Sequence, residues 1–218
     1  MTYTDYVQSY LQHQDYGIPI YTDEIAEAVA ADYGIEKKNA SAATAVAVKR
    51  IIDGDKLPDL RCYQKGIYYR TTNTPFGEIG INREKLIARK YLDFDNGYET
   101  GLRLLHHLGL TTQMPNEHLL ATNAAKDCIR YDKKLGVSIC PPKVTITSEN
   151  KVYLQVLDAL DLLDKAPVDV ENPYNILANH IRKNNLKYET LLYFADRYYN
   201  RKTILRIAHT ASQKEEII

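Results

Sequence analysis

Glycine and proline divide the first 70 residues into short segments, and the order of these segments limits the fold more than any other sequence feature. Residues 4–13 have helical spacing, and their apolar face holds Tyr6, Val7, Tyr10 and Leu11. Gly17 and Pro19 end this pattern, because glycine is flexible and proline cannot continue a helix. Residues 18–21 therefore predict a short extended piece after the first helix.

Two further helix patterns follow the extended piece. Thr22 is a favourable N-cap for a helix that ends at Gly34, and its inner face holds Ile25, Ala26 and Val29. A third helix begins at Asn39 or Ser41 and ends before Asp53-Gly54. Its predicted packing side holds Val48, Ile51 and Ile52.

A β-hairpin signal closes this region. Residues 60–63 and 67–70 are rich in strand-forming residues and flank Gln64-Lys65-Gly66, whose glycine suits a tight turn. Three helices followed by a hairpin is the order of a winged helix-turn-helix. We therefore predict such a domain over residues 1–75 and a second domain over residues 76–218.

The second domain is predicted to be mixed helix and sheet, so the fold class is α/β, more closely α+β. Residues 71–80 have the composition of a linker, and helix patterns cover residues 82–92 and 98–109. The candidate strands of a small sheet are residues 117–123, 127–134, 136–142 and 143–147. The remainder is helical, at residues 150–165, 172–186, 188–200 and 202–211.

Composition favours a cytoplasmic protein that does not enter a membrane. The chain is 44% hydrophobic, has no apolar run of membrane-spanning length and lacks a signal-peptide pattern at its start. Cys62, Cys128 and Cys140 form no CxxC pair, which argues against a zinc knuckle. The net charge is zero, and nucleic-acid binders more often have a basic excess.

Two adjacent histidines, His106 and His107, raise the question of a metal site. Adjacent helical residues point about 100° apart, and a helical zinc pair needs spacing i, i+4. Glu99 and Glu117, the nearest carboxylates in sequence, lack that spacing too. We therefore expect no metal here, but a structural helix in which Leu102, Leu105 and His106 pack against the sheet.

Other patterns that resemble catalytic motifs have simpler interpretations. Asp93 and Asp95 have the spacing of a nucleotidyltransferase metal pair, but no Gly-Ser loop precedes them. Asp158, Asp161 and Asp164 alternate with leucines and predict the wet face of an amphipathic helix. The sequence lacks GxxxxGK and GxSxG motifs. We expect neither catalysis nor a cofactor.

Residues 98–115 carry a resemblance to a known family. Similar positions in this segment are Gly101, Leu105, Leu108, Gly109, Leu110, Thr112, Gln113 and Pro115. Together with the hairpin sequence QKGIYYR, they resemble the AbiEi-type antitoxin and transcriptional-regulator family of type IV toxin–antitoxin systems, which acts in abortive infection. The resemblance covers roughly residues 20–165.

This resemblance implies a two-part antitoxin. Its N-terminal winged helix would bind operator DNA and repress its own operon, while its second domain would counteract a nucleotidyltransferase-type toxin. Two alternatives stay open. The first is a transcription factor whose second domain senses a ligand or forms a homodimer, and the second is an enzyme with an unrecognised site.

The expected DNA contacts lie on the third helix and the hairpin, because a helix-turn-helix reads the major groove with its second helix. Over residues 1–75 the net charge is −2, so basic residues must gather on one side. The candidate contacts are Lys37, Lys38, Asn39, Ser41, Thr44, Lys49, Arg50, Tyr63, Lys65 and Arg70. Any apolar band left exposed on the C-terminal helices would suit a protein partner or self-association.

Overall fold

The computed structural model describes residues 2–213, apart from the side chain of Phe94. The predicted second domain therefore extends past the described residues at 214–218. Helices make up 49% of the structure and strands 15%, which confirms the prediction of a mixed helix-and-sheet protein. The chain divides into two compact units, one ending at Leu86 and the other beginning at Ile87. None of the described helices is both long and apolar enough to span a bilayer.

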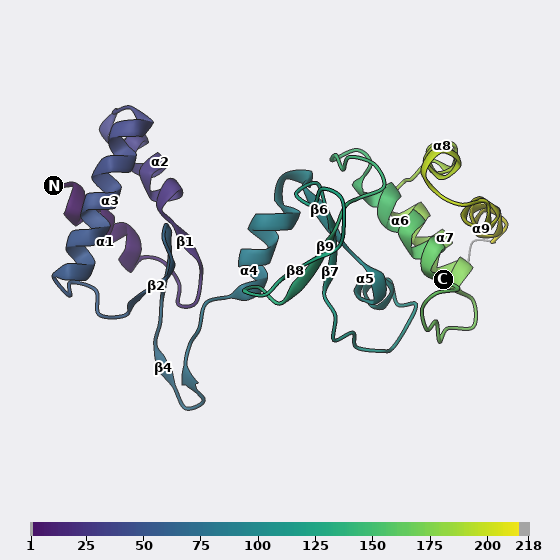
Figure 1. Ribbon diagram of the computed structural model, residues 1–218, viewed down its shortest axis with the longest axis horizontal. Coiled ribbons are helices and arrows are strands. Elements are labelled where there is room, and N and C mark those ends of the chain that lie inside the picture. The colour runs from purple at the N-terminus through teal and green to yellow at the C-terminus, as the bar shows by residue number, and fades with distance from the viewer. Residues whose placement is uncertain (1, 214–218) are drawn as a thin grey trace. The chain divides into compact units, whose positions relative to one another are not determined.

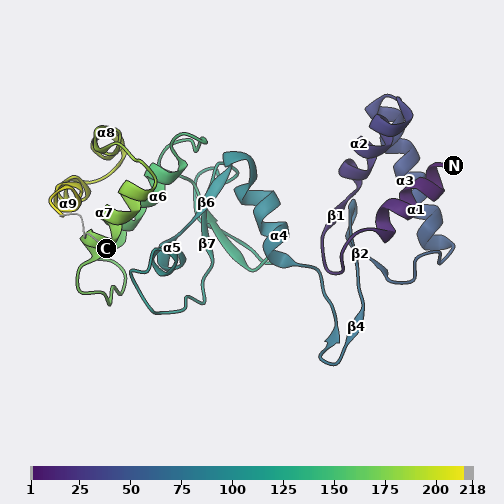
Figure 2. The same ribbon diagram turned by 180° about the vertical axis from the view of Figure 1, so that it is seen from behind.

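The first unit contains three helices and a three-stranded sheet, as can be followed in Figures 1 and 2. The helices are α1 (Tyr3–Gln12), α2 (Thr22–Tyr33) and α3 (Lys37–Asp53). The strands are β1 (Ile20–Tyr21), β2 (Leu60–Gln64) and β3 (Ile67–Arg70). The sheet order is β1-β3-β2 with antiparallel pairing throughout, so the segment between α1 and α2 forms the strand next to β3.

An aliphatic core holds the three helices together. Val7, Leu11, Ile25, Val48 and Ile51 are among its buried members. Thr2 caps α1 through a reciprocal pair of hydrogen bonds with Asp5, which satisfies backbone N–H groups at the helix start. Ile52, predicted to pack inward, is exposed instead. It lies one residue beyond Ile51, and a helix turns about 100° per residue, so only one of the two faces the core.

Residues 71–80 form a second hairpin where the sequence predicts a linker. Its strands are β4 (Asn73–Thr74) and β5 (Gly77–Glu78), paired antiparallel. Thr74 fixes the turn, because its hydroxyl donates to Gly77 O and accepts from the backbone N–H of Phe76. These hydrogen bonds of Thr74 order a polar segment whose composition alone predicts a loop. The short helix α4 (Arg83–Ile87) follows the hairpin.

A four-stranded sheet begins the second unit. A π-helical turn η1 (Ala88–Leu92) and a 3-10 turn η2 (Asp93–Asp95) lead into β6 (Gly97–Thr100) and α5 (Gly101–His107). The remaining strands are β7 (Leu119–Thr122), β8 (Arg130–Asp132) and β9 (Val137–Cys140). The order is β6-β7-β9-β8, and only β7 and β9 are parallel.

Two predicted elements of this unit differ in the structure. The helix expected from residue 98 begins at Gly101, because residues 97–100 pair with β7 as strand β6. Residues 143–147, expected to be a strand, are irregular. The backbone of Ile146 bonds a side chain instead of a neighbouring strand: its N–H donates to Asn123 Oδ1, and its C=O accepts from Asn123 Nδ2.

Four helices complete the second unit: α6 (Lys151–Leu162), α7 (Pro173–Lys183), α8 (Tyr188–Tyr198) and α9 (Arg201–Ala211). They share one apolar core with α5, and its buried members include Leu105, Leu110, Leu157, Leu177 and Leu191. Leu105 therefore packs chiefly with these helices rather than with the sheet. Helices α8 and α9 pack on each other and on α6, and α7 packs on α9 (Figure 1).

Candidate functional site

Helix α3 presents an exposed face in the first unit. A three-residue turn, 34–36, separates it from α2, and Gly34 adopts the left-handed conformation there (φ 61°). The side of α3 that faces α1 and α2 is apolar and buried. The predicted contact residues on the opposite, exposed side are Lys37, Lys38, Asn39, Ser41, Lys49 and Arg50.

Thr44 does not lie on this face. It is 1% exposed, and its hydroxyl oxygen has no hydrogen-bond partner among the described residues. The i, i+4 spacing from Ala40 and to Val48 places it in the buried stripe of α3. The prediction that Thr44 contacts DNA was therefore wrong, because its side chain is buried.

Lys37 is engaged within the protein. Its ammonium lies 2.6 Å from Glu27, and both side chains are well exposed. The hydrogen bond from Lys37 to Glu27 raises the pKa of the lysine, with the carboxylate charge acting in the same direction. Any nucleic acid that binds Lys37 has to compete with Glu27.

The β2–β3 hairpin is short, and its turn lies against α2. Lys65 is exposed at this turn, whereas Tyr63 is partly buried. Gly66 has φ 84° and accepts hydrogen bonds from both the backbone N–H and the hydroxyl of Thr22. Lys65 is therefore presented from a turn fixed at the start of α2.

Arg70, a predicted hairpin contact, belongs to the interior of the first unit. Its guanidinium pairs with Asp59 at 2.7 Å and donates to the carbonyl oxygens of Gln12 and Gln14. The guanidinium also lies over the Tyr16 ring, 4.6 Å from the centroid, and the side chain is 14% exposed. With its donors directed to these groups, Arg70 joins α1 to the sheet instead of facing outward.

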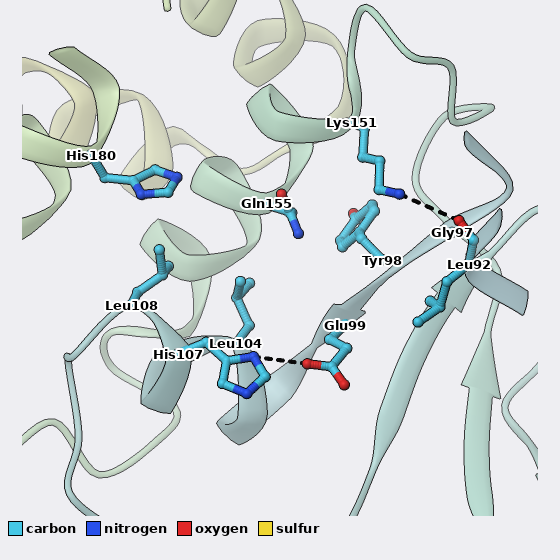
Figure 3. A pocket seen from close by; sticks show the side chains of 10 residues that line it. All are labelled: Leu92, Gly97, Tyr98, Glu99, Leu104, His107, Leu108, Lys151, Gln155 and His180. Carbon is cyan, nitrogen blue, oxygen red and sulfur yellow. Dashed lines mark hydrogen bonds and ion pairs between the residues drawn. The ribbon is translucent and has the colours of Figure 1, made fainter. Parts of the chain in front are cut away.

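The second unit contains a pocket of about 330 Å³ between β6, α5, α6 and α7 (Figure 3). Leu92, Leu104 and Leu108 form apolar parts of its wall. Its polar lining is Tyr98, Glu99, His107, Lys151, Gln155 and His180. Its size and mixed lining match those of small-molecule sites in general.

Glu99 is the only carboxylate among the lining residues, and basic side chains surround it. His107 Nδ1 lies 2.8 Å from one carboxylate oxygen, and His118 Nε2 lies 2.7 Å from the other. The His118 contact lacks hydrogen-bond alignment, since that nitrogen has no hydrogen-bond partner in the described chain. Arg103 approaches Glu99 at 3.6 Å.

This cluster does not follow from the sequence, because the spacing of residues 98–107 predicts a single helix there. In the structure Glu99 belongs to β6, and the chain turns at Gly101 (φ 69°) before α5 carries His107 back toward it. His118 comes from the segment next to β7.

The other basic groups of the pocket differ in their surroundings. Burial lowers the pKa of His180, and the nearby charge of Lys183 lowers it further. Lys151 Nζ donates to Leu92 O at 3.4 Å. The imidazole of His180, the ammonium of Lys151 and the amide of Gln155 therefore line the same pocket as the Glu99 carboxylate, which is paired with His107.

Asp158 and Asp161 are not on a wet helix face as predicted. The Asp158 carboxylate accepts hydrogen bonds from Tyr98 (3.0 Å), Thr100 (2.9 Å) and Tyr199 (2.6 Å). Loss of solvation raises the pKa of Asp158, although these hydrogen bonds oppose the shift. Asp161 is paired with Lys165, and of the three aspartates only Asp164 is exposed. Helices α8 and α9 pack on α6 and cover the side that an isolated amphipathic helix would leave in water.

No protein-family model, curated protein or solved structure matches this chain.

Proposed function

We propose that this protein is a cytoplasmic DNA-binding transcriptional regulator whose first unit acts as a winged helix-turn-helix. One observation carries the proposal: α3 follows α2 after a three-residue turn and has polar and basic side chains on its exposed face. The antiparallel β1-β3-β2 sheet supports it, because the sheet closes the same unit with a hairpin. In such proteins the second helix of the pair enters the major groove.

The exposed face of α3 fits a groove better than it fits a flat surface. Ala42 and Ala45 are small and exposed, so the helix backbone can approach DNA closely. Asn39 and Ser41 carry groups that bond base edges, and Val46 can contact a thymine methyl group. Lys38, Lys49 and Arg50 supply phosphate contacts. Since the face has few base-reading side chains, we expect modest sequence discrimination.

We also propose that the second unit gives the protein an antitoxin role, in which it represses its own operon and counteracts a nucleotidyltransferase-type toxin. The support is the resemblance of residues 98–115 to AbiEi-type antitoxins. Several of these residues have structural roles: Leu105 and Leu110 are buried, and Gly109 has φ 73°. Thr112 donates its backbone N–H and hydroxyl to Asp169. The resemblance therefore concerns how this unit folds, and toxin contacts must be sought on its surface.

Fluorescence anisotropy with the DNA upstream of the gene tests the first proposal. We expect tighter binding to this DNA than to a scrambled duplex, and weaker binding at about 200 mM than at about 50 mM salt. The variant Lys49→Ala/Arg50→Ala should bind at least tenfold more weakly, because it loses two phosphate contacts. Lys126→Ala/Arg130→Ala is the matched control in the second unit. Equal affinity of the wild-type protein for both duplexes would refute sequence-selective regulation.

Co-expression with a nucleotidyltransferase encoded beside the gene tests the antitoxin role. Restored growth supports it, and no protection despite intact DNA binding rejects it. In that case a second function gains support, a regulator whose second unit senses a small molecule. The pocket beside Lys151, Gln155 and His180 is the observation that favours this alternative.

A further inference from the structure

The zero net charge of the chain conceals two oppositely charged parts. Residues 173–213, which form α7, α8 and α9, contain seven Lys and Arg but only two Asp and Glu, a net charge of +5. Residues 1–172 contain 20 basic and 24 acidic residues, a net charge of −4. The strongest basic excess therefore lies on the C-terminal helices, outside the unit that carries α3.

Most of these basic side chains are at the surface. Arg206 is the main exception, since it is buried, pairs with Asp164 and donates to Leu160 O. The exposed ones are Lys183, Lys187, Arg197, Arg201 and Lys202. Three of them lie within the six residues 197–202, where α8 ends and α9 begins. We call residues 197–202 the α8–α9 turn.

Aromatic side chains accompany the basic ones. Tyr193 is 53% exposed, and the Arg197 guanidinium lies 3.8 Å from its ring centroid. Tyr198, within the α8–α9 turn, is 38% exposed. Exposed tyrosines beside arginines contribute little to the core of the protein, whereas nucleotide bases stack on such rings.

Charge placement in α9 points away from a purely stabilising role. Arg201 and Lys202 occupy its first turn, where the helix dipole disfavours cations. Lys202 lies 3.6 Å from Asp164, with both side chains largely exposed, and Arg201 has no ion pair within residues 2–213. Neutral substitutions at these positions should therefore leave folding intact.

We propose that the α8–α9 turn, together with Tyr193, is a second nucleic-acid-binding surface that takes single-stranded nucleic acid. Arg197, Arg201 and Lys202 contact backbone phosphates, and Tyr193 and Tyr198 stack on unpaired bases. Binding of this kind depends on charge and stacking, so it tolerates many sequences. The surface is separate from α3, and its failure would leave the proposed operator binding untouched.

An acidic protein is the competing occupant of this surface. The exposed tyrosines favour nucleic acid over an acidic protein, because bases stack on flat aromatic rings while the exposed cations pair with phosphates. Glu189 and Asp196 are also exposed on α8, so the binding face must lie toward the turn rather than along the whole helix. The proposal therefore predicts that loss of three charges at the turn removes most of the affinity.

Anisotropy of labelled oligouridylate and oligothymidylate of about 12 nucleotides, added to the full-length protein, tests this surface. Arg197→Gln/Arg201→Gln/Lys202→Gln should weaken binding at least tenfold and reduce the slope of log affinity against log salt by about 2. Tyr193→Ala should weaken it at least fivefold, while Tyr193→Phe, which keeps the ring, should stay within twofold. Thermal unfolding confirms that each variant folds.

Two comparisons make the test decisive. Lys126→Gln/Arg130→Gln/Lys133→Gln removes three exposed charges elsewhere in the second unit and should change affinity less than twofold. In the Lys49→Ala/Arg50→Ala background, which lacks the proposed phosphate contacts of α3, the triple substitution at the α8–α9 turn should cause the same fold loss of affinity for the oligonucleotides as in the wild-type protein. No binding by the wild-type protein, or an equal loss in the Lys126 triple variant, would overturn the proposal and leave an acidic protein as the occupant to pursue.

Discussion

The two units each use one charged side chain to join a helix to strands, and they use opposite chemistry. In the first unit Arg70, at the end of β3, pairs with the Asp59 carboxylate and reaches the carbonyl oxygens after α1. In the second unit Asp158, in α6, accepts from hydroxyl groups on β6 and at Tyr199. Arg70 has an opposite charge as its partner, whereas Asp158 accepts from three neutral hydroxyls and has only the more distant charge of Lys143 to oppose its raised pKa.

This difference governs how each junction responds to loss of its central residue and to pH. A guanidinium keeps its charge at any ordinary pH, and its partner Asp59 can turn to water when it is removed. A desolvated carboxylate with neutral partners can take up a proton, and its three donors stay enclosed when it is lost. We therefore expect the Asp158 junction to be the more sensitive one in both respects.

Removal of the carboxylate should give the largest effect. Asp158→Ala leaves the hydroxyls of Tyr98, Thr100 and Tyr199 without their acceptor, and we expect a loss of about 3 kcal/mol in the free energy of unfolding. Urea denaturation measures it. Asp158→Asn keeps one acceptor oxygen and a similar volume, so its loss should be about 1 kcal/mol. Equal losses in the two variants would contradict the role of the hydroxyl network.

Removal of the arginine should cost less. Arg70→Met keeps the aliphatic part of the side chain but loses the pair with Asp59 and the carbonyl bonds, and we expect a loss of about 2 kcal/mol by the same measurement. Arg61 provides a control, since its pair with Glu78 has both side chains about half exposed. Arg61→Met should cost less than about 1 kcal/mol. If Arg70→Met proved as mild, Arg70 would be a surface residue, as first expected from the sequence.

The contrast between these junctions also shows what the sequence can predict. Local patterns predicted the extents of α1 and α2 well, and Gly34 ends α2 in the left-handed conformation that glycine allows. The prediction that Thr22 caps α2 was wrong, because Tyr21 holds the N-cap position and the Thr22 hydroxyl donates to Gly66 O, far away in sequence. The buried sides of Val48 and Ile51 followed from helical periodicity in the same way. Neither Arg70 nor Asp158 was interpreted correctly, since each is defined by partners far away in sequence. A charged residue in an amphipathic pattern looks solvent-exposed until the covering elements are known.

The candidate sites show the same contrast between features set by local sequence and features set by distant partners. The exposed positions of α3 at Lys38, Lys49 and Arg50 could be chosen from spacing alone. The contact of Glu99 with His107 and His118 could not, because it depends on β6 ending at Thr100 and on the turn at Gly101. The basic excess on residues 173–213 was countable from the sequence, but the zero total charge hid it. A charge count by segment would have revealed that signal.

The dependence of stability on pH also separates the two junctions. Burial raises the pKa of Asp158, so between its ordinary value and this raised value the folded protein holds a proton that the unfolded chain has released. The free energy of unfolding due to Asp158 therefore falls as pH rises through this window, by at most about 1.4 kcal/mol per pH unit. Asp132 titrates below the window, because hydrogen bonds from Lys90 and Tyr91 outweigh its burial and hold its pKa at about 2.

Urea denaturation of the wild-type protein and Asp158→Asn, from about pH 5 to about pH 8, isolates this contribution, since asparagine does not titrate. We expect the stability advantage of the wild type over Asp158→Asn to shrink as pH rises. The advantage over Arg70→Met should stay constant across the same range, because the guanidinium keeps its charge. A constant advantage over Asp158→Asn would mean that the three hydroxyl groups hold the carboxylate ionised, and the two junctions would then differ in geometry but not in their response to protons.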